Sequence, residues 1–321
     1  MVNNIADVAA TGKKVIDEVE RAVVGKRKLL EMIMASMLAG GHVLLEDNPG
    51  LGKTLIARSF AAVLGLDFKR IQFTPDLLPG DITGGYILDR AKNNFQLRQG
   101  PIFANIILAD EINRASPKTQ SALLEAMQEE QVTLEGESLS LPEPFLVIAT
   151  QNPIEYEGTF PLPEAQLDRF MLKLSVGYPD VAEEKEILNR RHTRRQEDVK
   201  LESVTSAVEL MQMRAVVETV HVDPDLEEYI ARIVHATRKD RRVAVGASPR
   251  GSLAFLKMAR AYAALEGRDY ILPDDIKRFA QPILAHRIIL IPEYWVARDI
   301  TSEVISGILD KVSVPVVGKA E

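Results

Sequence analysis

The sequence predicts an α/β fold in which helices flank a parallel sheet, followed by a smaller domain built from helices. Short segments rich in apolar residues, separated by turns and helical patterns, are typical of buried parallel strands. They cover residues 43–45, 68–73, 105–109, 145–149 and 171–176. After a turn at 177–180 this pattern stops, and apolar residues recur at helical spacing. We therefore expect an αβα domain over residues 1–178 and a helical domain over residues 179–321.

Composition limits the classes of function. The chain has 321 residues, enough for two domains, and its 46% hydrophobic and 26% charged residues are ordinary for a globular protein. A net charge of −7 argues against a dominant role on nucleic acid or anionic membranes. The chain contains no cysteine, which fits the reducing cytoplasm, the expected location. The polar start and the lack of a long apolar stretch predict no signal peptide and no membrane insertion.

Two helices are expected before the first strand. Apolar residues recur every three or four positions from about residue 5 to residue 40. The pattern is interrupted at Val23, Val24 and Gly25, where we expect a turn between the helices.

A candidate phosphate-binding loop follows the strand at 43–45. Residues 47–54 read Asp-Asn-Pro-Gly-Leu-Gly-Lys-Thr, and a helical pattern starts at Gly52. A strand, a glycine-bearing loop and a helix N-terminus together direct backbone N–H groups and the positive end of the helix dipole at one anion. In this arrangement Lys53 reaches the β- and γ-phosphates of a nucleotide, and the hydroxyl of Thr54 binds Mg²⁺.

The strict pattern for such a loop, G-x-x-x-x-G-K-[ST], is not fully met, because Asp47 occupies the first glycine position. A residue other than glycine is acceptable there if its backbone angles are ordinary. The alternative is a plain strand–turn–helix junction in which Gly-Lys-Thr occurs by chance. Residues further along the chain decide between the two.

Two acids follow the apolar strand at 105–109. Asp110 would contact Mg²⁺ or a water bound to it, and Glu111 would polarise a water for attack on a γ-phosphate. The alternative is an ordinary strand with acids at its solvent end. Because parallel strands bring their carboxyl ends to one edge of the sheet, we expect both acids in the same crevice as Lys53.

Two further residues are candidates for chemistry. Asn152 follows the strand at 145–149, where it can orient a water against a γ-phosphate. The alternative for Asn152, equally favoured from the local sequence, is an Asx turn before a proline. Arg169 lies at a surface corner, where the alternative is an ion pair with Asp168 or Glu164.

Two hairpins are expected within the αβα domain. Prolines and glycines punctuate residues 74–100, and apolar residues on both sides of the polar turn at 92–94 predict a hairpin near 81–99. Apolar and polar residues alternate on both sides of a Glu-Gly turn and predict a second hairpin at 132–141. Insertions of this kind commonly contact partners.

Five helices and a loose tail after about Val312 are expected in the second domain. The helices cover residues 182–195, 204–219, 224–238, 249–266 and 273–288. Arg250 lies in the first turn of the fourth helix, after the capping Ser248. Basic residues cluster at 190–195 and 238–242 without interleaved aromatic residues, which favours a solvated face or a subunit interface over nucleic-acid binding.

With these residues assembled, the chain closely resembles the MoxR family of AAA+ ATPases, in the helix-2-insert clade. The stretches that carry the resemblance are LLEDNPGLGKT, LADEINRASPKTQSALLEAMQE, IATQNPIEYEGTFPLPEAQLDRF and GASPRGSLAFLKMARAYA. The middle two are highly specific. VVGKRKLL near the start and ILPDDIKRFAQPILAHRI near the end extend the likeness over nearly the whole chain. The family's phosphate loops accept an acidic departure such as Asp47.

The resemblance implies an AAA+ P-loop NTPase that binds ATP or ADP with Mg²⁺: a nucleotide-binding αβα domain followed by a small all-α lid. It assigns a role to each candidate residue. Val24 and Gly25 line the adenine; Asn48, Pro49, Gly50, Leu51, Gly52, Lys53 and Thr54 form Walker A; Asp110 and Glu111 form Walker B; Thr54 and Asp110 hold Mg²⁺; Asn152 is the sensor-1 residue; Arg169 is the arginine finger on a neighbour's ATP; and Arg250 is the sensor-2 arginine of the lid.

The resemblance also implies how such a protein works. Subunits assemble into a hexameric ring, both hairpins face its axial pore, and a lid that closes on nucleotide turns phosphate loss into domain rotation. The work is chaperone-like: the ATPase remodels a partner complex or helps it take up metal, typically a partner with a von Willebrand factor A domain. The alternatives are a nucleotide-dependent binding switch with slow hydrolysis as a timer and, less favoured, a nucleic-acid-dependent motor.

Overall fold

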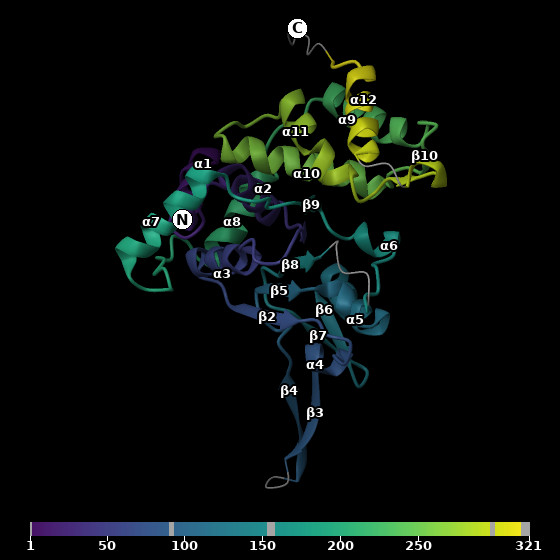
Figure 1. Ribbon diagram of the computed structural model, residues 1–321. Coiled ribbons are helices and arrows are strands. Elements are labelled where there is room, and N and C mark those ends of the chain that lie inside the picture. Colours follow the sequence, from purple (N-terminus) through teal and green to yellow (C-terminus); the bar gives the residue numbers. More distant parts are fainter. Residues whose placement is uncertain (1, 90–92, 153–157, 296–298, 316–321) are drawn as a thin grey trace.

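A five-stranded parallel sheet forms the centre of the αβα domain (Figure 1). The computed structural model describes residues 2–89, 93–152, 158–295 and 299–315. The strands follow the order β2-β5-β8-β1-β9, and all neighbours pair in parallel. They are β1 (Val43–Glu46), β2 (Phe68–Gln72), β5 (Ile106–Asp110), β8 (Leu146–Gln151) and β9 (Leu172–Leu174). Every strand predicted for the sheet is present, with small shifts at its ends.

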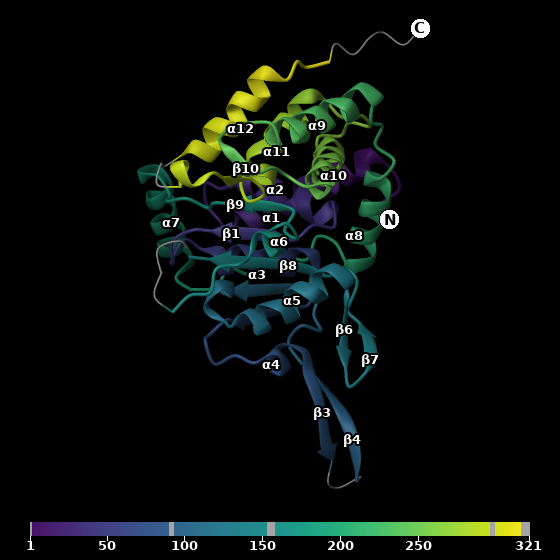
Figure 2. The ribbon, with the colours of Figure 1, turned by 90° about the vertical axis from the view of Figure 1, so that its right-hand side faces the viewer.

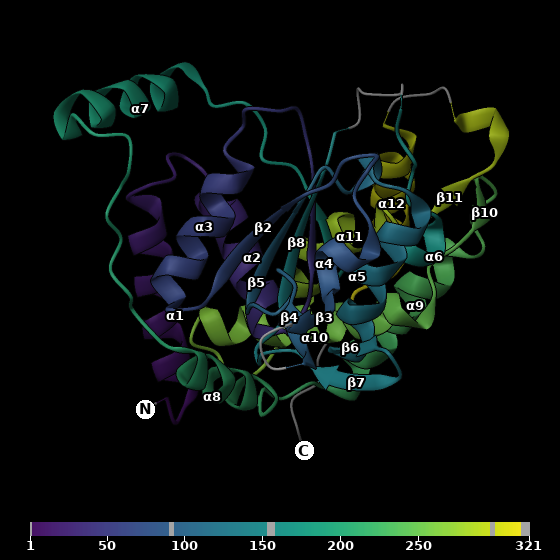
Figure 3. The same cartoon turned by 90° about the horizontal axis from the view of Figure 1, so that it is seen from below.

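Helices cover both faces of this sheet. Because successive side chains of a strand point to opposite faces, neighbouring residues enter different cores. Leu45 joins the core that contains α3 (Lys53–Leu64), and Leu44 joins the core that contains α5 (Pro117–Glu129). Figure 3 shows α3 and α5 on either side of the strands. The α3 face therefore carries the phosphate loop.

The helical domain shares the core of the α3 face. The helices after residue 178 are α7 (Val181–Arg194), α8 (Ala207–Val217), α9 (Pro224–Thr237), α10 (Pro249–Leu265), α11 (Pro273–Leu284) and α12 (Ile300–Lys311). Helix α7 contributes no buried residue to this core. The N-terminal helices α1 (Ile5–Glu20) and α2 (Arg27–Leu38) pack on α10, and α1 also packs on α3. One apolar cluster thus runs from the sheet into the helical domain. Within the described residues, none of the helices has the length and apolar character needed to cross a membrane.

The helical domain also differs from the sequence prediction in two places. Residues Val243–Val245 (β10) pair with Ile289–Leu290 (β11) in a small antiparallel ladder, whereas only helices were expected. Strands this short have no periodicity to detect. Helix α12 was not predicted, although Val304, Ile305 and Ile308 are buried at helical spacing.

Both predicted hairpins are present and project from the same end of the αβα domain (Figure 2). They are β3 (Gly84–Asp89) with β4 (Asn94–Gln99), and β6 (Gln131–Leu134) with β7 (Glu137–Ser140). The first begins later than expected, because Pro79–Thr83 form the short helix α4. The hydroxyl of Tyr86 donates a hydrogen bond of 2.6 Å to Glu137 and so joins the two hairpins.

A buried histidine fixes the amino end of β1. His42 is 7% exposed, and its Nδ1 accepts a hydrogen bond of 3.0 Å from the backbone N–H of Val147. Its Nε2 therefore carries the proton and donates to the carbonyl of Met127 at 2.9 Å. Burial lowers the pKa of His42 from 6.5 to about 4. The neutral imidazole is the form that the fold requires.

We expect acid to weaken the fold through His42. Its folded-state pKa lies below its unfolded value, so its contribution is complete above pH 6.5 and is lost as the pH falls toward 4. Between pH 7.5 and pH 5 the loss amounts to about 2 kcal/mol. Urea unfolding of the wild type and of His42→Gln at both pH values measures it. Equal pH dependence in the two proteins would contradict the prediction.

Candidate functional site

The phosphate loop connects β1 to α3 and has the backbone that an anion site needs. Gly50 and Gly52 have φ angles of 84° and 82°, in the left-handed region that favours glycine. A Cβ at either position would meet nothing within 4 Å, so the loop presents open backbone to a ligand. Asp47 is not among the described non-glycine residues with positive φ, so the departure from the strict pattern introduces no strain.

Asp47 anchors this loop to the chain that leaves β9. Its carboxylate accepts hydrogen bonds of 2.7 Å from the Ser175 hydroxyl and from the Gly177 N–H. Burial acts to raise the pKa of Asp47, but these hydrogen bonds outweigh it and hold the pKa below its usual value. Asn48, the next residue, donates through Nδ2 to the hydroxyl of Tyr178 at 3.1 Å. Sequence reasoning did not identify this anchor.

A cavity of about 260 Å³ beside the loop brings together the predicted phosphate-binding, magnesium-binding and water-activating residues. It is lined by Pro49, Gly50, Gly52, Lys53, Thr54, Arg70, Asp110, Glu111, Thr150 and Asn152. The Nζ of Lys53 donates a 2.5 Å hydrogen bond to the carbonyl of Asp47. Burial lowers the pKa of Lys53, and the surrounding acids oppose that shift. The crevice expected at the carboxyl ends of the strands is therefore present. It combines Lys53, the hydroxyl of Thr54 and the two acids Asp110 and Glu111.

Thr150 organises the two acids. Its hydroxyl donates to Oδ1 of Asp110 at 2.6 Å and accepts from the backbone N–H of Glu111 at 2.9 Å. The other oxygen of Asp110 accepts two hydrogen bonds from Arg70, at 2.6 Å from Nη2 and 3.0 Å from Nε. Sequence reasoning missed Arg70 and Thr150, because their roles depend on how β2, β5 and β8 align.

The carboxylate of Glu111 is held at the edge of the cavity. Its Oε2 accepts hydrogen bonds from Gln72 at 2.8 Å and from Arg114 at 3.0 Å. The backbone of Glu111 has a φ of 56°, an uncommon conformation for a glutamate. Gln72 and Arg70 are two positions apart on β2 and also hydrogen-bond each other at 2.6 Å, so β2 contacts both acids.

The cavity suits a magnesium ion together with a nucleotide phosphate. The hydroxyl of Thr54 and the carboxylate of Asp110 are oxygen donors in one cavity with Lys53. Mg²⁺ is commonly bound through one or two protein oxygens, with phosphate oxygens and waters as its other ligands. The residues present therefore fit the ion. A metal at Asp110 would share this carboxylate with Arg70.

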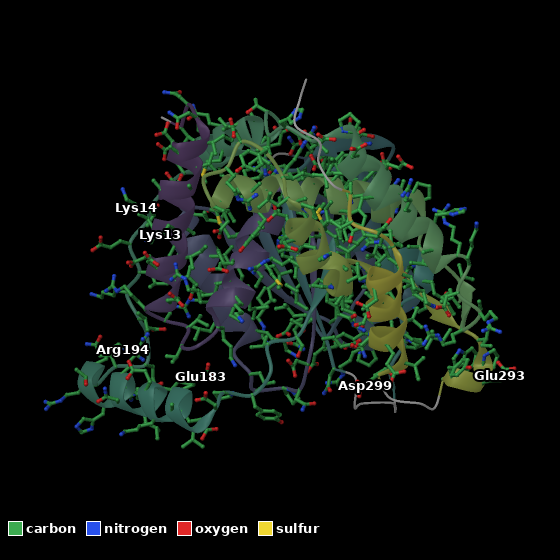
Figure 4. The ribbon with its side chains drawn as sticks, turned by 90° about the horizontal axis from the view of Figure 1, so that it is seen from above. Lys13, Lys14, Glu183, Arg194, Glu293 and Asp299 are labelled. Carbon is green, nitrogen blue, oxygen red and sulfur yellow. The ribbon has the colours of Figure 1, made fainter. Side chains whose placement is uncertain are left out.

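A second cavity, of about 190 Å³, adjoins the first and is apolar. It shares Gly50 and Gly52 with the phosphate cavity, and its apolar lining residues include Val23, Val24, Leu51, Leu55, Val176 and Ile187. An apolar cavity of this kind suits a planar base. Gly25 lies beside the carboxylate of Glu183, and its φ of 72° is in the left-handed region that favours glycine. Figure 4 labels Glu183 on α7, the helix along this edge of the molecule.

Arg169 and Arg250 line a third cavity instead, of about 330 Å³, which we call the arginine cavity. Nη2 of Arg250 donates to Gln128 at 3.2 Å, and Nη1 of Arg169 donates to the carbonyl of Leu124. Gly41 and His42, which precede β1, also line it. The two arginines come from different domains, and the structure brings them together.

The arginine cavity and the phosphate loop lie at opposite ends of β1. The four residues of this strand span roughly 13 Å. Neither Arg169 nor Arg250 is among the described residues that line the phosphate cavity. The ion pair considered between Arg169 and Asp168 is not the contact found, because Asp168 instead pairs with Arg287 at 2.8 Å.

The two basic clusters make local contacts. Arg191 pairs with Glu197 at 2.6 Å, and Arg190 pairs with Glu186 at 2.7 Å. In the second cluster Arg242 forms two hydrogen bonds with the carboxylate of Asp240. These pairings support a solvated face over a surface kept open for phosphate backbones.

Comparison with known proteins identifies the family. Residues 42–172 match the model of the ATPase family associated with various cellular activities (AAA), and residues 235–307 match an AAA lid domain. The chain is 44% identical over 315 residues to Chaperone MoxR1 of Mycobacterium tuberculosis, covering 95% of this chain and 82% of that protein. The chain belongs to the MoxR family of AAA+ ATPases. Members of the family are ATPases, and the fold described above is that of an AAA+ domain with a helical lid.

Other relatives agree with this membership. The uncharacterized protein YeaC of Bacillus subtilis is 49% identical over 303 residues, covering 94% of both chains. A crystal structure of a protein from Cytophaga hutchinsonii, assigned as an ATPase, superposes with a TM-score of 0.90 at 43% identity and covers 97% of both chains. The MoxR architecture therefore extends over nearly the whole chain.

We expect Thr150→Val to impair this MoxR protein, because the substitution keeps the shape of the side chain and removes its hydroxyl. Asp110 loses a donor and the N–H of Glu111 loses its acceptor in a position that is 1% exposed. Unfolding free energy should fall by about 1–3 kcal/mol, and ATP turnover by roughly tenfold or more. Urea unfolding and phosphate release measure these effects. Thr150→Ser should restore both, and wild-type turnover in the valine variant would contradict the assignment.

Proposed function

We propose that this MoxR protein hydrolyses ATP to ADP and phosphate in a Mg²⁺-dependent reaction and uses the cycle to remodel a partner protein. The observation that carries the proposal is the single cavity in which Lys53, Thr54, Asp110, Glu111 and Asn152 meet beside an open glycine loop. The name of the relative MoxR1, a chaperone, supports the remodelling role.

Each residue of the cavity has a definite task in this proposal. Loop N–H groups and Lys53 bind the phosphates, and the neighbouring apolar cavity holds the adenine. Mg²⁺, held by Thr54 and Asp110, supplies positive charge to the phosphates. Glu111 accepts the proton of the attacking water, and Asn152 orients that water. Phosphoryl transfer depends mainly on such positioning and charge stabilisation.

Completion of the site requires a second subunit. Arg169 and Arg250 lie at the far end of β1 from their own phosphate loop, so we assign both to the ATP of a neighbour. For Arg250, this assignment replaces the expectation of a lid that closes on the nucleotide of its own chain. An interface between the loop end of one chain and the arginine end of the next is head-to-tail, and such contacts close into rings. We propose six subunits, as in the family's ring.

The partner would contact the two hairpins. Phe95 and Ile87 on the β3–β4 hairpin are 69% and 52% exposed, which supports a contact surface for another protein. We place both hairpins at the axial pore of a cytoplasmic ring. We propose a partner with a von Willebrand factor A domain, whose complex is remodelled or helped to take up metal.

One observation favours the second candidate, a binding switch with hydrolysis as a slow timer. Glu111 is held through Oε2 by Gln72 and Arg114, and these contacts compete with its action on a water. A partner that stimulates turnover and becomes more sensitive to protease in the presence of ATP would favour remodelling. Unchanged turnover and an intact partner would favour the switch.

The first test separates binding from chemistry. Glu111→Gln should bind ATP as the wild type does and lose turnover by about a hundredfold or more, because an amide cannot accept the proton. Lys53→Ala should lose ATP binding itself. A fluorescent nucleotide measures affinity, and phosphate release measures turnover. Wild-type turnover in Glu111→Gln would remove Glu111 from the role of base.

The second test concerns the shared site. Specific activity of the wild type should rise with protein concentration, whereas Arg169→Ala should stay near zero at every concentration. Arg232→Ala is the control, since Arg232 forms a surface pair with Glu228 within one helix. A rate that is independent of concentration and survives Arg169→Ala would show that each chain hydrolyses ATP alone.

A further inference from the structure

A buried arginine joins the helical domain to the corner that carries Arg169. Arg287 follows α11, and its side chain is only 3% exposed. Its Nε donates to Oδ1 of Asp168 at 2.8 Å, across 119 residues of sequence. Asp168 is the residue immediately before Arg169, so the contact fixes the backbone from which Arg169 extends.

The remaining nitrogens of Arg287 also donate hydrogen bonds. Nη2 donates to the carbonyl of Phe170 at 2.6 Å, and Nη1 donates to the carbonyls of Met171 at 3.2 Å and Ile283 at 2.6 Å. His286 adds a hydrogen bond of 3.0 Å to the carbonyl of Phe170. A guanidinium bonded through all three nitrogens in this way has little freedom to move.

Asp168 also holds the helix that carries Arg250. Its second oxygen, Oδ2, accepts a hydrogen bond of 2.8 Å from the hydroxyl of Ser248. Ser248 is the N-cap of α10, and its hydroxyl accepts from the backbone N–H of Arg250 at 3.1 Å. One carboxylate therefore links the backbone beside Arg169 to the first turn that carries Arg250.

We propose that Asp168 and Arg287 are positioning residues that hold Arg169 and Arg250 as one rigid unit, delivered together to the ATP of a neighbouring subunit. The inference rests on the proposed function, in which both arginines act between subunits. Removing one partner of a buried ion pair leaves the other charge uncompensated, so the pair is expected to persist through the ATP cycle. At this corner the lid and the αβα domain would then move as one body.

Asp168→Asn tests the proposal, because asparagine keeps the size of the side chain and removes its charge. We expect kcat to fall tenfold or more, because a small displacement of a charged catalytic group is costly. The affinity of each chain for ATP should stay within about twofold, since its own phosphate loop is at the other end of β1. Wild-type kcat in this variant, or a loss of ATP affinity with kcat unchanged, would overturn the proposal.

A matched control separates positioning from general stability. Asp275 forms two hydrogen bonds of 2.8 Å with Arg268 in the helical domain, and its side chain is only 5% exposed. Asp275→Asn should lower the unfolding temperature and leave kcat per folded oligomer unchanged. An equal loss of kcat in both variants would mean that lid stability alone accounts for the effect.

Mixing subunits gives a readout that a structural defect would not produce. Asp168→Asn chains keep an intact phosphate loop, and Lys53→Ala chains keep an intact arginine corner. Each alone should be nearly inactive, whereas the mixture should recover at least several-fold, because a Lys53→Ala chain supplies arginines to its neighbour's ATP. No recovery, with mixed oligomers confirmed by mass spectrometry, would overturn the proposal.

Ser248→Ala provides a second route if Asp168→Asn does not fold. It should lower kcat at least threefold, whereas Ser206→Ala, which removes the N-cap of α8 and no contact with Asp168, should not. Equal kcat in the two serine variants would overturn the proposal. If Arg169→Ala also retains turnover, the shared site itself fails. If Arg169→Ala is inactive while Asp168→Asn and Ser248→Ala keep the wild-type kcat, the shared site stands and the proposed positioning role of Asp168 and Arg287 is wrong.

Discussion

The direction of strand β1 imposes the main constraint on this protein. A parallel strand has one carboxyl end, where the phosphate loop begins, and one amino end, where the arginine cavity lies. Four residues separate the two ends, a distance that an arginine side chain does not span. In the function that we propose, a complete site for phosphoryl transfer therefore needs two copies of the chain, and assembly becomes a condition for turnover.

The amino end of β1, like its carboxyl end, is held by hydrogen bonds to neighbouring elements. The imidazole of His42 contacts the backbone of β8 at Val147 and of α5 at Met127. The carbonyl of His42 accepts the N–H of Met171 at 2.8 Å, two residues after Arg169. A buried neutral histidine thus joins three elements around the floor of the arginine cavity. Because these are backbone contacts, the position of the cavity depends on the fold more than on surface side chains.

The sequence predicted what is encoded locally and missed what depends on register. The phosphate loop, the Asp110–Glu111 pair and both hairpins occur within short windows that have recognisable patterns. Arg70 gave no such signal, because its contact with Asp110 exists only once β2 lies beside β5. The location of Arg250 followed from packing of the helical domain, and the contact between Asp168 and Arg287 joins residues 119 positions apart. Such contacts are properties of the tertiary structure.

Strand β9 connects the segment that carries Arg169 to the phosphate loop within one chain. Before it, Asp168 holds the arginine corner; after it, Ser175 and Gly177 bind the carboxylate of Asp47 in the phosphate loop. Between these points β9 pairs with β1, and Lys173 forms an ion pair of 2.5 Å with Glu46. A displacement of the loop on loss of phosphate would pull on β9 and thus on the arginines that we assign to the next subunit. Each chain would then report its own nucleotide state to its neighbour through its shortest strand in the sheet.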